Sequence, residues 1–404
     1  MAHSLFTVMP AFVLLFWLVL FYLDDKKNKA KRFLFFFLFV AFINYTVHWC
    51  YFNHNYKLYY ILDSIWIFTS LSVFPLYYYY IRLLTKDIEI NYRWSWILIP
   101  AFSLALFSAT LYLLMSPEEI DVFTNEILYH NRPRSGNYSA LIRLQILRTE
   151  LFKVFFTVEV ILTVFFGLRL IKRFNKKVLA YYSDVQNREL SNIKSTLLFL
   201  LATAIISIIS NILGKDFFAN NDYLLSIPSI SHSIVLFGLS YVGYKQSFSI
   251  RQLVDDQLLP VTQIYQEEKE EEDDKEELLG SIYDALYLQM EYLLNEKQIF
   301  RDADLRLDEL ALKLGTNRTY VSRLINNKAN TNFCYYINSY RVEHAKKMLS
   351  AKDGEPQTLD GIALESGFSS QSSFYRVFMM MEGISPAKYR AEQTIKKQLK
   401  YKTV

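Results

Sequence analysis

Long apolar and aromatic stretches fill the chain up to about residue 245, and short polar connections separate them. An α-helix needs about 20 residues to cross a bilayer, which is close to the length of each stretch. Several stretches are apolar on every face, which argues against buried helices of a soluble domain. The pattern predicts an all-α protein that begins with a seven-helix transmembrane bundle. The expected spans cover residues 5–23, 33–52, 58–80, 96–115, 151–171, 193–213 and 223–244.

The positions of lysine and arginine predict the orientation of this bundle, because connections rich in these residues stay in the cytoplasm. Cations gather in the first, third and fifth connections, at Lys26, Lys27, Lys29, Lys31, Arg32, Arg82, Lys86, Arg93, Lys172, Arg173, Lys176 and Lys177. Residues 116–150 are an exception on the other side, with Arg132, Arg134, Arg143 and Arg148. We expect the N-terminus outside and the C-terminus in the cytoplasm. The first residues lack the charged start of a cleaved signal peptide, so the first span is expected to remain.

A helix-turn-helix pattern occupies residues 305–327. Apolar residues at helical spacing predict one buried face, formed by Leu307, Leu310, Ala311 and Leu314. Gly315 is placed to end that helix, and Asn317 is a suitable N-cap for the next one. In this second helix Val321, Leu324 and Ile325 point inward. The outward positions are then Thr319, Ser322 and Arg323.

The same order of signals recurs between residues 358 and 378. Thr358 is placed to cap a helix and Gly367 to end it, while Phe374 and Phe378 predict the buried face of the following helix. That helix exposes Gln371, Ser372, Tyr375 and Arg376. Residues 332–349 form a longer amphipathic helix pattern, able to hold the two units at a fixed separation. Such a pair can enter successive major grooves, about 34 Å apart.

The tandem pattern resembles the DNA-binding domain of the AraC/XylS family of bacterial transcription regulators, over roughly residues 282–392. The matching residues include Leu310, Ala311, Ser322, Arg323, Phe333, Ile337, Arg341, Ala345, Ile362, Gly367, Phe368, Ser372, Phe374, Arg376, Phe378, Gly383, Pro386 and Tyr389. The resemblance implies sequence-specific binding to double-stranded operator DNA and action on RNA polymerase. By position, the family's base-facing sites correspond to Thr319, Ser322, Arg323, Gln371, Ser372, Tyr375 and Arg376. Arginine bonds guanine bidentately and glutamine bonds adenine, so these residue types suit base recognition.

Two features depart from the family pattern. Met379 and Met380 stand where the family usually has lysines, and Asn326 and Asn327 end the first recognition helix. Fewer phosphate contacts lower the affinity for DNA and its dependence on salt. Cations available to compensate are Arg318, Lys328, Lys346, Lys347, Lys396, Lys397, Lys400 and Lys402. For the last four, in the basic tail, a solvated helix end is the alternative.

Polar side chains inside the predicted spans are candidates for a ligand-sensing site, because such groups are costly in a bilayer unless they are paired or hydrated. They are Asn44, His48, Asp63, Glu159, Asn211 and His232. These residues either line a pocket open to the outside or bond one another and hold the bundle together. His48, Cys50 and His54 form only part of a metal-ligand set, so we expect no metal and no cofactor. Cys50 and Cys334 lie on opposite sides in this topology, which excludes an internal disulfide.

The composition divides the chain into four parts. Residues 1–246 form the seven-span sensor domain, 247–277 an amphipathic and acidic linker, 278–392 the AraC-type DNA-binding domain and 393–404 a basic tail. The run EEKEEEDDKEE at residues 267–277 is typical of a solvated spacer. Pro260 interrupts a continuous helix in this linker, so a two-stranded coiled coil is left open.

The sequence lacks the common phosphate-binding, dinucleotide-binding and zinc-protease motifs, so we expect no enzymatic activity. It also lacks the internal repeat that many transporters show. We expect a membrane-bound transcription factor in the bacterial cytoplasmic membrane that responds to an unknown small-molecule or envelope signal. Pairing as a homodimer is left open. The alternatives are a multi-span receptor or transporter-like protein whose helix-turn-helix domain is regulatory, and a plain membrane anchor without a ligand.

Overall fold

The structure, a computed structural model, describes residues 2–24, 28–53, 56–129, 136–186, 188–213, 222–258, 276–350 and 357–402. Several positions discussed above lie outside the described residues: Lys26, Lys27, His54, Arg132, Arg134, Pro260 and the acidic run up to residue 275. The side chains of Asn211 and of the tail residues Lys396, Lys397, Lys400 and Lys402 also lie outside the description.

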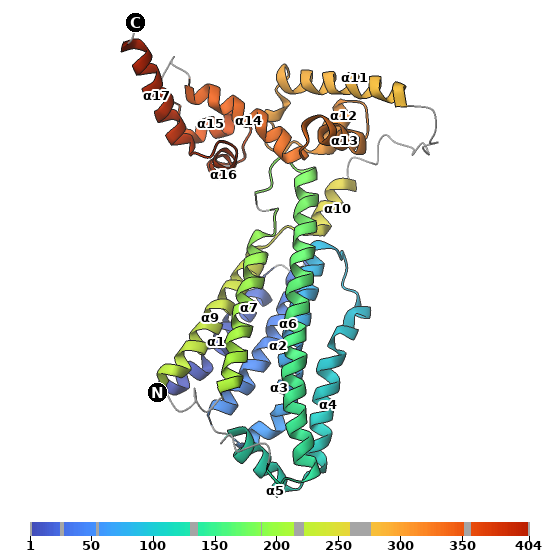
Figure 1. The fold of residues 1–404 in the computed structure, drawn as a ribbon, viewed down its shortest axis with the longest axis vertical. Helices are drawn as coiled ribbons and strands as arrows, with labels where there is room; N and C mark the ends of the chain where they lie inside the picture. Colours follow the sequence, from blue (N-terminus) through green and yellow to red (C-terminus); the bar gives the residue numbers. More distant parts are fainter. Residues whose placement is uncertain are drawn as a thin grey trace. The chain divides into compact units, whose positions relative to one another are not determined.

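Helices are the only regular elements among the described residues, which confirms the all-α fold class (Figure 1). Seven of them are long and apolar enough to cross a membrane, as the sequence predicted. They are α1 (Ala2–Leu23), α2 (Lys29–Phe52), α3 (Tyr56–Thr85), α4 (Ile99–Leu114) together with the 3-10 helix before it, α6 (Ala140–Tyr181), α7 (Ser191–Leu213) and α9 (Asp222–Lys245). A 3-10 helix, η1 (Tyr92–Leu98), precedes α4, and α5 (Pro117–Asp121) and the π-helix η2 (Val122–Tyr129) follow it.

Aromatic and aliphatic side chains fill the interior of the seven-helix bundle. In it, α2 packs against α1 and α3, and α9 packs against α1 and α7. One core cluster consists of Val47, Tyr51, Tyr59, Trp66, Ile67, Leu71, Ala101, Leu104, Ala105 and Phe152. The outer faces are apolar as well, since Phe12, Leu113 and Ile161 are 67%, 86% and 60% exposed. A surface this apolar suits contact with lipid better than contact with water.

The fifth long helix, α6, begins earlier than the sequence pattern indicated, at Ala140 instead of residue 151. Its first turns carry Gln145 and Arg148, which made this stretch look like part of a polar connection. Both are buried inside the bundle, where Gln145 donates to the carbonyl of Ser108 at 3.2 Å. Arg148 forms an ion pair with Asp63 at 2.7 Å. One of the four cations that formed the exception to the predicted orientation is therefore the partner of a buried carboxylate.

The chain folds into two compact units. The first comprises residues Met1–Phe174 and Leu190–Gln252, and the second comprises Asn175–Glu189 and Leu253–Val404. The end of α6 and the residues after it thus belong to the same unit as the helix-turn-helix patterns. Tyr182, in this segment, forms an isolated β-bridge with Arg306.

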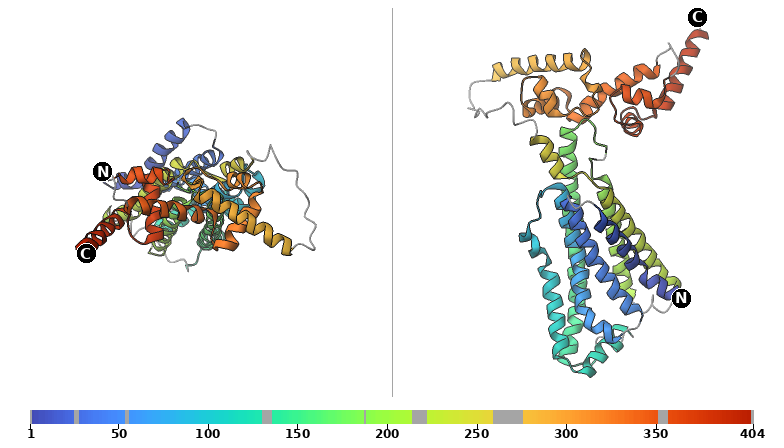
Figure 2. Two further views of the ribbon diagram at one scale, coloured as in Figure 1. Left: turned by 90° about the horizontal axis from the view of Figure 1, so that it is seen from above. Right: turned by 180° about the vertical axis from the view of Figure 1, so that it is seen from behind.

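In the second unit, two pairs of short helices pack around α14 (Phe333–Ser350) (Figures 1 and 2). α12 (Leu307–Lys313) packs against α13 (Arg318–Ala329), and α15 (Leu359–Glu365) packs against α16 (Gln371–Glu382). α14 contacts α13, α15 and α16, so it joins the two helix pairs. The remaining elements are α10 (Ile250–Leu258), α11 (Glu276–Asn295), η3 (Ile299–Arg301) and α17 (Pro386–Lys402).

Candidate nucleic-acid interface and ligand cavity

The first helix-turn-helix unit forms as its sequence signals require. Gly315 has a φ of +65°, the left-handed conformation that ends α12. The side-chain oxygen of Asn317 accepts hydrogen bonds from the backbone N–H groups of Thr319 and Tyr320, at 3.0 and 3.1 Å, and so caps α13. The inward side chains of α13 are at most 1% exposed; they are Val321, Leu324 and Ile325. This packing fixes which face of α13 points outward.

The second unit repeats this construction. Thr358 caps α15 by accepting a hydrogen bond from the N–H of Gly361 at 3.0 Å. Ser370 caps α16 in the same way, through the N–H of Ser373 at 3.1 Å. Gly367 has a φ of +86°, and a Cβ at this position would lie 2.4 Å from the carbonyl oxygen of Phe300. Glycine is therefore required here for both conformation and space.

The side chains proposed to meet DNA lie on the outer faces of α13 and α16. Seven of the eight are exposed: Arg318, Thr319, Arg323, Gln371, Ser372, Tyr375 and Arg376. The eighth, Ser322, is partly buried. Recognition helices of this kind use their N-terminal residues to contact base edges, so the arrangement presents suitable donors and acceptors. The substituted positions Met379 and Met380 are exposed on α16 as well, and they offer no cation to a phosphate.

A buried arginine on α14 links several parts of the second unit. Arg341 is fully buried, and its guanidinium donates to the carbonyl of Phe300 at 2.8 Å and to that of Asp302 at 2.6 Å. It also donates to the hydroxyl of Ser183 at 2.9 Å and to the carbonyl of Ser183 at 3.3 Å. Burial lowers the pKa of Arg341 to about 10, so the side chain is still cationic at neutral pH.

Residues after α6 contact the second recognition helix, which no sequence pattern indicated. The carboxylate of Asp184 accepts hydrogen bonds from the hydroxyls of Ser369 and Ser373. The side-chain oxygen of Gln186 accepts one from the hydroxyl of Ser370 at 2.6 Å. We call residues 182–186, 188 and 189 the docked segment. These contacts join positions far apart in the sequence, so local periodicity carries no signal for them.

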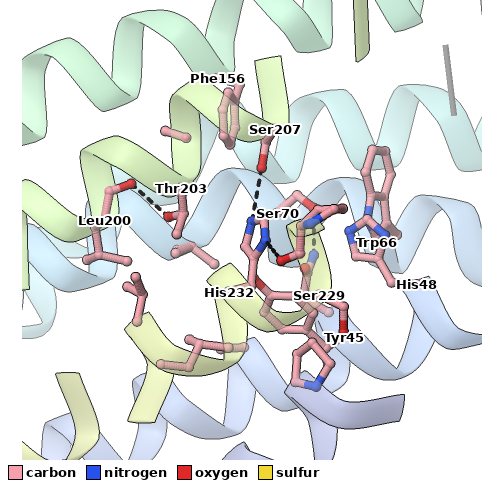
Figure 3. Close-up of a pocket in the computed structure, with 18 of the residues that line it drawn as sticks. Tyr45, His48, Trp66, Ser70, Phe156, Leu200, Thr203, Ser207, Ser229 and His232 are labelled. Carbon is pink, nitrogen blue, oxygen red and sulfur yellow. Dashed lines mark hydrogen bonds between the residues drawn. The ribbon is translucent and has the colours of Figure 1, made fainter. Parts of the chain in front are cut away.

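The membrane-compatible unit contains a cavity with a volume of about 190 Å³ (Figure 3). Its lining comes from α1, α2, α3, α6, α7 and α9, and is mostly apolar and aromatic, with Phe37, Phe52, Trp66, Phe74, Phe152, Phe156, Leu225 and Leu236 among the lining residues. Three of the six candidate sensing residues line it, namely Asn44, His48 and His232, and the side chain of a fourth, Asn211, lies outside the description. Among the described residues that line this cavity, none is Asp, Glu, Lys or Arg.

Hydrogen bonds fix the two histidines of the cavity, as Figure 3 shows for His232. Nδ1 of His232 lies 2.6 Å from the carbonyl oxygen of Pro228, so this nitrogen carries a proton. Nε2 of His232 lies 3.2 Å from the hydroxyl of Ser207. Nε2 of His48 accepts a hydrogen bond from the indole N–H of Trp66 at 3.0 Å. Both rings therefore have set orientations toward the cavity.

The two acidic candidates do not line the cavity. Asp63 is bonded to Arg148, and also accepts hydrogen bonds from the hydroxyls of Tyr59 at 3.1 Å and Tyr112 at 2.9 Å. Glu159 on α6 is buried, and its carboxyl oxygens have no hydrogen-bond partner among the described residues. The structure thus brings Asn44, His48 and His232 together and separates Asp63 and Glu159 from them.

The two cysteines are free and buried, Cys50 in the first unit and Cys334 in the second. Cys334 donates from its thiol to the carbonyl of Ser183 at 3.4 Å. Burial raises the pKa of Cys334 to about 12, which keeps the thiol protonated at neutral pH. A protonated, buried thiol is a poor nucleophile. The reactivity of Cys334 therefore reports whether its surroundings remain closed.

A helix-turn-helix domain family matches residues 310–392 of the chain. An uncharacterized HTH-type transcriptional regulator of Staphylococcus aureus (strain COL) is 34% identical over 90 residues, which are 22% of this chain and 12% of that protein. The uncharacterized HTH-type transcriptional regulator YtdP of Bacillus subtilis (strain 168) is 32% identical over 92 residues, 23% of this chain and 12% of that protein. The chain thus spans only about an eighth of the length of these relatives. No solved structure matches it significantly. The C-terminal region is a helix-turn-helix domain of the AraC type.

Proposed function

We propose that this protein is a membrane-bound transcription factor that binds operator DNA through α13 and α16 and regulates transcription with RNA polymerase. One observation carries the proposal: two complete helix-turn-helix units share α14, expose their recognition faces and belong to the same chain as seven membrane-compatible helices. The similarity to regulators in Staphylococcus aureus and Bacillus subtilis supports DNA binding. The membrane attachment rests on the apolar surface of the long helices.

The location follows from the requirement that the helix-turn-helix domain meet DNA. Seven spans with the N-terminus outside leave the C-terminus inside, and we propose the cytoplasmic membrane of a bacterium as the site. Exposed apolar residues on several of the long helices support contact with the lipid bilayer. Homodimer formation belongs to the same proposal, because many operators contain two half-sites.

We further propose that the cavity receives the signal. Its described lining residues combine an apolar, aromatic body with hydrogen-bonding groups on Asn44, Thr203, Ser207 and Ser229, and none of these described residues is Asp, Glu, Lys or Arg. A complementary ligand is an uncharged, largely apolar small molecule with one or a few polar groups. A charged ligand would lose its hydration without gaining an ionic partner here. The alternative is a receptor or transporter-like protein whose helix-turn-helix domain is only regulatory. In that case, changes to the cavity should not affect transcription.

DNA binding is tested on the full-length protein in lipid nanodiscs. A duplex enriched from a random library is compared with a shuffled duplex at the same salt concentration. We expect Arg376→Ala to weaken binding to the enriched duplex by about 1–3 kcal/mol and to relax one base position. Lys297→Ala removes an exposed cation outside both recognition helices and should leave the preference intact. Equal affinity of the wild type for both duplexes would contradict sequence-specific binding.

A further inference from the structure

The docked segment lies beside the recognition face of α16, where it contacts Ser369, Ser370, Ser373 and Arg376, while Gln371, Ser372 and Tyr375 stay exposed. We propose that it is an autoinhibitory latch. While Asp184 and Gln186 hold the serines around the start of α16 and Glu189 lies near Arg376, the second helix-turn-helix unit does not engage DNA, and binding requires the segment to leave. The inference rests on the proposed DNA-binding function, and its test separates the two.

The anchor of the latch is Ser183, which is 1% exposed. Its hydroxyl donates to the carbonyl of Leu305 at 2.6 Å and accepts from Arg341 at 2.9 Å. Its carbonyl accepts hydrogen bonds from Arg341 at 3.3 Å and from the amide of Asn338 at 3.2 Å. If the segment left, donors of the fully buried Arg341 would lose their partners, which is unfavourable unless water or another group replaces Ser183. Docking is therefore the favoured state when nothing competes.

The blocking group is the carboxylate of Asp184 at the start of α16. It is 7% exposed and bonds the hydroxyls of Ser369 and Ser373, while Gln186 bonds that of Ser370. A helix N-terminus attracts anions, and in helix-turn-helix proteins the first residues of the recognition helix approach the bases. In this structure the carboxylate of Asp184 lies at that end of α16, on the hydroxyls of Ser369 and Ser373.

The acidic side chains of the docked segment face α16, and its cation does not. Glu189 lies 4.0 Å from the guanidinium of Arg376, a proposed base-contacting residue. The cation of the segment, Arg188, is turned elsewhere: its guanidinium lies 3.5 Å from Asp304 and over the ring of Tyr182. Two carboxylates thus face the recognition helix, and they would repel incoming phosphates. The same segment competes for the arginine that DNA would bind.

The position of the segment in the chain supplies a route for control. It directly follows α6, a helix that continues without interruption from Ala140 to Tyr181. Phe152 and Phe156 of this helix line the cavity. A ligand that favours one position of α6 would therefore act on the residues that hold the latch, provided that its affinity differs between docked and undocked states.

The latch is tested by measuring DNA binding of variants that each lack one carboxylate, with the full-length protein in nanodiscs. Asp184→Ala and Glu189→Ala are measured against Glu296→Ala, which removes an exposed carboxylate outside the docked segment. The probe is the duplex that the wild type enriches from a random library. We expect each latch variant to bind it at least about fivefold more tightly, the lower end of typical coupling effects, and Glu296→Ala to bind as the wild type does. Latch variants that bind no more tightly than Glu296→Ala would overturn the latch.

Cys334 supplies a second readout that does not depend on affinity. The chain has two cysteines, so Cys50→Ser leaves Cys334 as its only thiol. Because Cys334 contacts the carbonyl of Ser183, undocking exposes it, and we expect Asp184→Ala and saturating duplex each to raise its rate of alkylation at least about fivefold. A rate that the duplex leaves unchanged would overturn the latch even if the variant folds poorly. A wild type and variants that bind no duplex at all would contradict the proposed function itself.

Discussion

The guanidinium of Arg148 lies 2.7 Å from the carboxylate of Asp63, and the two side chains are 2% and 1% exposed. The pair joins α6 to α3 inside the bundle. Removing one partner leaves the other as an uncompensated buried charge, so we expect Arg148→Ala to destabilise the protein by about 3–5 kcal/mol. The measurement is the thermal unfolding temperature in detergent together with the amount of inserted protein.

A matched control for this pair lies one turn away on α6. Glu150 and Lys153 form an exposed ion pair at 3.1 Å, and exposed pairs contribute at most about 1 kcal/mol. Glu150→Ala should therefore leave both quantities nearly unchanged. A normal unfolding temperature for Arg148→Ala would contradict the structural role of the pair. The same role predicts that Asp63→Asn lowers signal response and abundance together.

Gly367 and Gly315 end equivalent helices but differ in the space around them. Both have positive φ, yet a Cβ at Gly367 would lie 2.4 Å from a backbone oxygen, while one at Gly315 meets nothing within 4 Å. We expect Gly315→Ala to cost about 1–2 kcal/mol from conformation alone, and Gly367→Ala to cost more. Both losses of stability are measured in a Cys50→Ser background, as the denaturant concentration at the midpoint of Cys334 alkylation. Equal midpoints for the two variants would contradict the tight packing of Gly367.

The cavity is tested by two neighbouring positions on α7. Ala204 lines the cavity and is 2% exposed, whereas Ile205 is 50% exposed on the outer face. Ala204→Phe fills the cavity. We therefore expect a reporter gene regulated by this protein to show the same expression under two conditions between which its expression changes with the wild type. Ile205→Phe should preserve that change, with equal protein abundance in both. If reporter expression still changes with the Ala204→Phe variant at normal abundance, the signal is received at another site.

The orientation is tested by fusions to alkaline phosphatase, which is active only outside the cytoplasm. A fusion after Leu213 should be active and a fusion after Lys245 inactive, because the last span separates these two positions. Clusters of lysine and arginine in the first, third and fifth connections give the physical reason. The reverse activities would place the helix-turn-helix domain outside and exclude operator binding.

Local sequence signals predicted most elements of this fold. Asn317 and Gly315 mark a helix start and a helix end through their own backbone and side chains, so their roles follow from the nearby sequence. The pairing of Asp63 with Arg148, and that of Asp184 with Ser373, joins residues far apart in the chain. Hydrophobic periodicity reports which face of a helix is buried, but it does not report which distant polar group meets it. The cavity also depends on the packing of six helices, so only its polar lining was anticipated.

We propose that one membrane-embedded chain binds specific DNA. The most direct measurement is crosslinking of DNA to the full-length protein in intact cells, followed by separation of membranes from the soluble fraction and sequencing of the bound DNA. We expect a small set of enriched sites in the membrane fraction, lost in the combined Arg323→Ala and Arg376→Ala variant and retained in Lys297→Ala. Recovery of specific DNA only from the soluble fraction, or of the same DNA with the double variant, would contradict it.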